Sequence, residues 1–114
     1  MSKSGSQLEP FLEMLSAERG AAANTLHAYR RDLEDFLNMV NSRGRDELRA
    51  DDTDIISYLE AMAERGLAAS SRARKLSALR QFFRFLYAEG IRGDDPAASI
   101  DSPKRGRRLP KVLS

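Results

Sequence analysis

Apolar side chains recur through the first 41 residues at the three- and four-residue spacing typical of helices with one buried face. A first helix is predicted over residues 7–19, and Gly20 follows it where a left-handed residue commonly ends a helix. A second helix is predicted over residues 24–41, with Asn24 or Thr25 as its cap. The apolar positions of these two helices are Leu8, Phe11, Leu12, Leu15, Leu26, Tyr29, Leu33, Phe36, Leu37 and Val40.

The second half of the chain carries two more helical patterns. One begins near Asp52 to Asp54, whose side-chain oxygens can cap a helix, and it ends before Gly66. The other runs from Ser70 to about Glu89 and ends before Gly90. Their apolar positions are Ile55, Ile56, Leu59, Met62, Leu76, Leu79, Phe83, Leu86 and Tyr87. The sequence carries no strand signals, so an all-α fold of four main helices is predicted.

The composition changes after Gly90, because glycine and proline interrupt a basic segment that has no room for an apolar face. The interrupting residues are Gly93, Pro96, Pro103, Gly106 and Pro110. We therefore predict a helical domain over residues 1–92 and an extended linker over residues 93–114. Because linkers join domains, a further domain is expected after Ser114.

The formal net charge of +2 hides an asymmetry between the two parts of the chain. Residues 1–69 hold 8 Lys and Arg against 13 Asp and Glu, a net charge of −5. Residues 70–114 hold 11 Lys and Arg against 4 Asp and Glu, a net charge of +7. Clustered positive charge concentrates phosphate, so the second part is the one expected to face a polyanion. From charge alone, a solvated basic helix face and a basic tail explain the asymmetry equally well.

The composition argues against enzymatic chemistry within this chain. It has no cysteine, a single histidine at position 27, no glycine-rich phosphate loop and no serine nucleophile motif. Asp51, Asp52 and Asp54 lack the spacing of a calcium loop, so neither a metal nor a cofactor is expected. The polar residues 1–7 and the short apolar runs lead us to expect neither a signal peptide nor a membrane-spanning segment. Since the absence of cysteine fits a reducing compartment, we expect a cytoplasmic protein.

The fourth predicted helix carries the clearest binding signal. Residues 70–88 include Arg72, Arg74, Lys75, Arg80 and Arg84 and no acidic residue. A turn of about 100° per residue places five side chains opposite Leu76 and puts Lys75 at the flank. The five opposite side chains are Ser71, Arg74, Ala78, Gln81 and Phe85. Small and basic residues on one face suit a DNA groove, and the hydroxyl groups of Ser70 and Ser71 suit a phosphate.

The second predicted helix repeats this arrangement more weakly. Asn24 and Thr25 stand at its start, and Arg30 and Arg31 follow about one and a half turns later. Nearby acidic residues can pair with these arginines, so a structural role stays open. Together with the basic linker, the predicted DNA-contacting residues are Asn24, Thr25, Arg30, Arg31, Ser70, Ser71, Arg72, Arg74, Lys75, Lys104, Arg105, Arg107 and Arg108.

The order of these motifs resembles that of phage-integrase-like and Xer-type tyrosine recombinases. The first group is Asn24-Thr25-Leu26, Tyr29 to Leu33, and Phe36. The second group is Ser70-Ser71, Ala73-Arg74, Leu76 to Arg80, Phe83, Leu86-Tyr87, Asp95-Pro96-Ala97, Ser102-Pro103-Lys104 and Arg108 to Lys111. The second group is similar to the fourth helix and interdomain linker of XerD-like members. XerC-like members are a nearer alternative than phage or transposon integrases. The resemblance covers residues from about Leu8 to Ser114.

This resemblance implies an amino-terminal core-binding domain, a SAM-like bundle of four orthogonally packed helices that covers one face of DNA. It implies that the helices starting near Asn24 and Ser70 face the major groove. The catalytic residues of the family lie in a second domain, so this chain is expected to bind DNA without cleaving it. The implied partners are a double-stranded recombination site and a related XerC-like recombinase in a tetramer. Tyr29, Tyr58 and Tyr87 are not expected to be the nucleophile.

Two other hypotheses stay open. The bundle can be a protein-interaction domain whose basic face binds acidic partners or a second copy. It can also be the same domain of a phage or transposon integrase rather than of a chromosomal recombinase. A DNA-clamp domain needs its basic face to bind DNA, whereas a protein-interaction domain does not. Charge reversal at Arg74 and Lys75 that leaves DNA binding intact but breaks an oligomer would therefore support the protein-interaction hypothesis.

Overall fold

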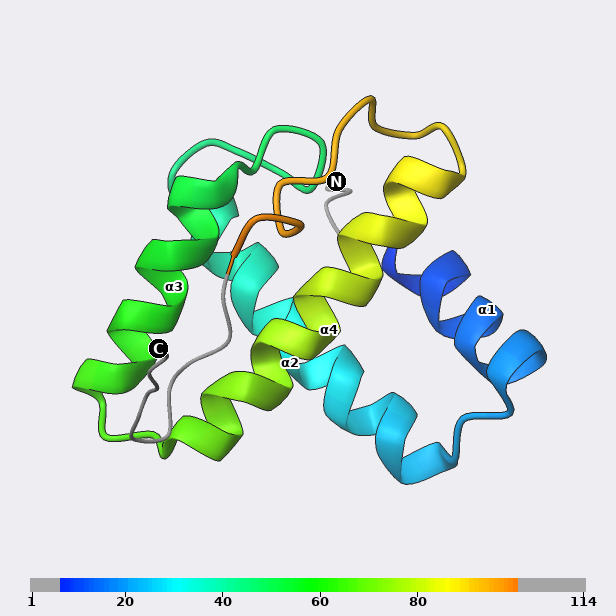
Figure 1. Ribbon diagram of the computed structural model, residues 1–114, viewed down its shortest axis with the longest axis horizontal. Coiled ribbons are helices and arrows are strands. Elements are labelled where there is room, and N and C mark those ends of the chain that lie inside the picture. The colour runs from blue at the N-terminus through cyan, green and yellow to red at the C-terminus, as the bar shows by residue number, and fades with distance from the viewer. Residues whose placement is uncertain (1–6, 101–114) are drawn as a thin grey trace, which may run out of the picture.

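The computed structural model describes residues 7–100, which form four helices in a bundle (Figure 1). These are α1 (Leu8–Arg19), α2 (Ala23–Ser42), α3 (Asp52–Glu64) and α4 (Ala69–Ala88). The predicted all-α fold with four main helices is confirmed, and the bounds differ from the predicted ones by a residue or two. No helix within residues 7–100 has both the length and the apolar composition that crossing a membrane requires.

The helix α4 is the one around which the others pack. It contacts α1, α2 and α3, and it crosses α2 in Figure 1. The rings of Phe82 and Phe83 contact Phe11 of α1 and Phe36 of α2, with centroids 5.4 Å and 6.1 Å apart respectively. Burying each such side chain stabilises the fold by about 1.5–3 kcal/mol. The buried apolar residues of α4 are Leu76, Ala78, Leu79, Phe82, Phe83 and Leu86.

Local signals set the helix ends. Gly20 follows α1 with a φ of 61°, and its N–H bonds to the carbonyl oxygen of Leu15, as the predicted stop requires. The start of α3 is a capping box, in which Asp51 accepts from the Asp54 N–H at 3.0 Å and Asp54 accepts from the Asp51 N–H at 3.1 Å. A carboxylate cap of α3 was predicted at Asp52 to Asp54, and the observed N-cap residue is Asp51, one position earlier.

Three predicted side-chain positions are wrong. Ile56 and Tyr87 were assigned to buried faces but are 43% and 54% exposed, whereas Phe82, which was assigned to no buried face, is fully buried. Ala78 was assigned to the open face of α4 but is fully buried. Because α4 packs against three helices, its buried surface is wider than the single stripe that the periodicity indicates.

The packed body continues beyond Arg92. Pro96, Ala97 and Ile100 are buried, and a turn over residues 96–99 folds this segment back against the bundle. Arg80 donates a hydrogen bond to the carbonyl oxygen of Ile100. The prediction of an extended linker is therefore wrong for residues 93–100, because apolar side chains of this segment belong to the core. The rest of the predicted linker lies outside the described residues.

Candidate nucleic-acid interface

The helices α2 and α4 both begin at the lower edge of the view in Figure 1. Their N-cap residues, Ala22 and Ala68, offer no side-chain acceptor, and neither first turn contains an acidic residue. The start of α3 differs, because it is closed by the Asp51 and Asp54 carboxylates. The N–H groups at the starts of α2 and α4 therefore suit an external anion.

Four of the predicted contact residues stand at these two starts. Asn24 and Thr25 occupy the second and third positions of α2 and are exposed. Ser70 and Ser71 occupy the same positions of α4, where Ser70 is exposed and Ser71 is partly buried. The prediction that Asn24 or Thr25 caps α2 is wrong, because the helix begins at Ala23 and both side chains lie within its first turn.

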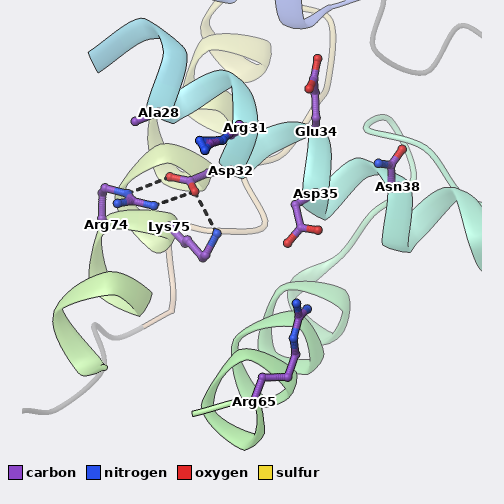
Figure 2. A pocket seen from close by; sticks show the side chains of 9 residues that line it. All are labelled: Ala28, Arg31, Asp32, Glu34, Asp35, Asn38, Arg65, Arg74 and Lys75. Carbon is purple, nitrogen blue, oxygen red and sulfur yellow. Dashed lines mark hydrogen bonds and ion pairs between the residues drawn. The ribbon is translucent and has the colours of Figure 1, made fainter. Parts of the chain in front are cut away.

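A groove of about 630 Å³ lies between α2, the end of α3 and α4 (Figure 2). Three predicted DNA-contacting residues line it, namely Arg31, Arg74 and Lys75, and Arg65 adds a fourth cation that was not predicted. Three carboxylates of α2 line it as well, so the side chains carry one more positive than negative charge. The lining residues are Ala28, Arg31, Asp32, Glu34, Asp35, Asn38, Arg65, Arg74 and Lys75.

Asp32 connects α2 to α4 inside this groove. Its carboxylate accepts hydrogen bonds from Arg74 Nε at 3.0 Å, from Arg74 Nη2 at 2.9 Å and from Lys75 Nζ at 2.9 Å (Figure 2). The side chains of Asp32 and Lys75 are 3% and 11% exposed, whereas that of Arg74 is 50% exposed. The hydrogen bond with Asp32 raises the pKa of the Arg74 guanidinium above its usual value. Arg74 is thus a charged and accessible group that is held at a fixed position.

Two other predicted arginines make contacts within the protein. Arg30 pairs with Glu9 of α1, and this hydrogen bond lowers the pKa of the Glu9 carboxyl and raises that of Arg30. Arg30 lines a different groove, which α1 and α2 form and which includes His27. Arg72 donates through Nε to the carbonyl oxygen of Leu67 at 3.3 Å, which fixes the turn between α3 and α4. The sequence analysis left a structural role for Arg30 open, and Arg30 also lies 3.8 Å from the Glu34 carboxylate of its own helix. The contacts with Glu9 and with the Leu67 carbonyl group were not predicted.

Arg65 is the residue of the groove that the sequence analysis missed. It follows α3 directly before Gly66 and has no basic neighbour in the sequence. The packing of α3 against α2 brings it into the groove, where its side chain points towards Asp35 (Figure 2). No local signal could have found it. The predicted linker contacts Lys104, Arg105, Arg107 and Arg108 lie outside the described residues.

The buried tyrosine of α3 is a structural residue. Tyr58 donates from its hydroxyl to Asp35 Oδ2 at 2.8 Å, and its ring lies against Phe36. Burial, and then the hydrogen bond with Asp35, raise the pKa of the Tyr58 phenol, so it stays protonated. Among residues 7–100 there is also no cluster of His, Asp and Glu side chains that could hold a metal ion.

The chain folds as a small helical bundle, and its groove is lined by four cationic and three anionic side chains. The chain belongs to the phage integrase, N-terminal SAM-like domain family, whose profile matches residues 8–90. This membership confirms the family resemblance that the motifs indicated.

Several relatives are similar over nearly the whole chain. The chain is 58% identical over 111 residues to a tyrosine recombinase XerD of Rhizobium meliloti (strain 1021), a match to 97% of this chain and 36% of that protein. It is 53% identical over 112 residues to XerD of Agrobacterium fabrum, a match to 98% of this chain and 34% of that protein. For XerD of Caulobacter vibrioides the identity is 46% over 113 residues, or 99% and 37% of the two chains. The chain thus spans about a third of the length of these relatives.

Proposed function

We propose that this chain is a DNA-binding domain that places the starts of α2 and α4 against duplex DNA. The observation that carries the proposal is that two open helix starts accompany a groove lined by Arg31, Arg65 and Arg74. Membership of the phage integrase N-terminal family supports it, as do the XerD recombinases among the relatives. The two helices are those that the family resemblance assigns to the DNA-facing side.

Backbone phosphates are the primary ligands in this proposal. Helix N–H groups and arginines are the donors that phosphate oxygens accept from most readily. About four to eight such contacts give micromolar affinity that falls steeply with salt. Asn24, Thr25 and Ser70 add exposed polar side chains at the two helix starts.

The remaining predicted contacts are assigned different parts. Lys75, which is buried against Asp32, is assigned a structural role in holding that carboxylate rather than a direct contact with DNA. Arg30 and Arg72 contribute through the positions of α1 and of the turn before α4. The four basic residues at positions 104–108 are proposed to extend the contact along the DNA.

We further propose that the chain acts within a site-specific tyrosine recombinase, as the names of its relatives suggest. Such an enzyme cuts and rejoins DNA strands through a tyrosine, and we place its catalytic residues outside this chain. The proposed partner is a related XerC-like recombinase, with which the enzyme forms a tetramer on paired recombination sites. The proposed role of this chain is to bind the DNA of the recombination site.

The proposal is tested by measuring duplex binding of Arg31→Gln by fluorescence anisotropy. Losing one charge-assisted phosphate contact should weaken binding about fivefold. The matched control is Arg84→Gln, an exposed arginine of α4 that lies about three turns beyond Arg74. Its affinity should change less than about twofold, since only long-range attraction is lost. Equal effects of the two variants would contradict a binding surface at the groove. Unchanged DNA binding with lost self-association would favour a protein-interaction domain instead.

A further inference from the structure

Asp32 is an acidic residue at the centre of a surface that is proposed to bind an acidic polymer. Its carboxylate is almost fully buried and accepts two hydrogen bonds from Arg74 and one from Lys75. We infer that Asp32 is a positioning residue that holds the Arg74 guanidinium ready for a DNA phosphate. This inference rests on the proposed function.

The charges of this cluster leave one positive charge in excess, and Arg74 presents it. The carboxylate of Asp32 and the ammonium of Lys75 lie together inside the protein, where each compensates for the burial of the other. The Arg74 side chain is half exposed. Arg74 is therefore the member of the cluster that a phosphate can reach.

The geometry of the Arg74 guanidinium suits two acceptors. Asp32 binds the edge formed by Nε and Nη2, and a second oxyanion binds the edge formed by Nη1 and Nη2. Because Asp32 already fixes the side chain, little conformational freedom is lost when a phosphate binds. Without Asp32 the arginine keeps its charge but loses its position.

The same carboxylate also fixes α2 relative to α4. Asp32 lies in the third turn of α2, and Arg74 lies in the second turn of α4. The helix α3 joins this network, because Lys75 Nζ is 5.9 Å from the centre of the Tyr58 ring and Tyr58 donates to Asp35. The cluster thereby helps to set the separation of the two helix starts, which the DNA backbone must match.

The test compares Asp32→Asn with Glu34→Gln in the 114-residue chain. Both changes remove one negative charge from α2 at the same groove, but Glu34 is exposed and its carboxylate lies 3.8 Å from Arg30 rather than beside Arg74. The dissociation constant for a short duplex of random sequence is measured by anisotropy, with folding checked by circular dichroism.

Electrostatics alone predicts tighter binding for both variants, whereas a positioning role predicts opposite effects. We expect Asp32→Asn to bind about fivefold more weakly and Glu34→Gln to bind equally or up to about twofold more tightly. We also expect the slope of log affinity against log salt to be less negative by about 0.9 in Asp32→Asn than in wild type, because one phosphate contact is lost. A purely structural role of Asp32 would leave the slope of the folded variant unchanged.

A second pair of variants covers the case in which Asp32→Asn does not fold. The double variant Asp32→Asn/Lys75→Met removes the ammonium that would be left without its carboxylate. It is compared with Lys75→Met, in which Asp32 still holds Arg74. The double variant should bind DNA more weakly than Lys75→Met, although its net charge is one unit more positive.

The outcomes separate this inference from the proposed function. Equal or tighter binding by folded Asp32→Asn would overturn the positioning role and leave the proposed function standing. The same holds if the double variant binds at least as well as Lys75→Met. A wild-type chain that does not bind the duplex would overturn both.

Discussion

The guanidinium of Arg92 donates a 2.7 Å hydrogen bond to the carbonyl oxygen of Ala50, which joins the segment after α4 to the loop between α2 and α3. Arg92 also donates to the carbonyl oxygen of Glu47 at 3.0 Å, and its guanidinium lies 5.3 Å from the centre of the Phe83 ring. Its side chain is 7% exposed. One buried cation thus holds a loop that has little regular structure of its own.

Replacing this cation is expected to loosen the loop. Arg92→Ala removes charge-assisted bonds to two carbonyl groups and should lower the free energy of unfolding by about 2–3 kcal/mol. Urea denaturation measures the change. Arg49→Ala, at an exposed arginine of the same loop, is the control and should stay within about 0.5 kcal/mol of wild type. Equal stabilities of the two variants would contradict the role given to Arg92.

The extent of the packed body leads to a second prediction. A chain that ends at Arg92 lacks the buried residues Pro96, Ala97 and Ile100. Compared with a chain that ends at Ile100, it should lose about 2 kcal/mol or more of unfolding free energy. Thermal denaturation of the two chains makes the comparison. Equal melting temperatures would place the domain boundary at the residue that the sequence predicted.

The burial of Lys75 predicts that two groove cations differ in their effect on stability. Lys75→Gln leaves Asp32 with only Arg74 and should cost about 2–3 kcal/mol of unfolding free energy. Arg31→Gln changes an exposed side chain and should cost less than about 0.5 kcal/mol. Chemical denaturation of both variants checks this difference. Similar costs would mean that Lys75 is a surface residue like Arg31.

The capping carboxylate of Asp51 leads to a prediction about pH. The backbone N–H of Asp54 lowers the pKa of Asp51 below its ordinary value of 3.8, so folding favours the charged form. Its stabilising effect is therefore full above that value and is lost as the pH falls through the lowered pKa of the folded state. We expect Asp51→Ala to cost about 1 kcal/mol at neutral pH.

The melting temperatures of wild type and Asp51→Ala should then converge below about pH 4. Asp52→Ala is the control, since Asp52 is an exposed first-turn residue that does not form the cap. A difference between wild type and Asp51→Ala that is the same at every pH would contradict the role of the Asp51 charge.

The helices were predictable because their signals are local. Each has its own apolar period, and Gly20, Gly66 and Gly90 follow three of them with positive φ, as the sequence indicated. The burial of Ala78 and the exposure of Tyr87 were not predictable in this way, because they depend on which helices cover α4. Periodicity describes one face of a helix, and α4 has contacts on several.

The candidate site was predictable in outline and not in its contacts. The basic start of α4 stood out because no acidic residue lies within residues 70–88. Arg74 and Lys75 look equivalent in the sequence, yet Lys75 is buried and Arg74 is accessible. Both bind Asp32, which lies 42 and 43 residues before them in the chain. Arg65 joins the site only through the packing of α3. Such pairings are non-local, so one sequence does not reveal them.

The central claim, that this chain binds DNA through its groove and helix starts, is tested most directly by fluorescence anisotropy across a salt series. The wild-type chain is titrated onto a duplex carrying a Xer-type site and onto a scrambled duplex, from about 50 to 300 mM salt. We predict a slope of log affinity against log salt of about −4 or steeper, with tighter binding to the site if the helices also read bases. Binding that does not change with salt, or no binding at the lowest salt, would contradict the claim.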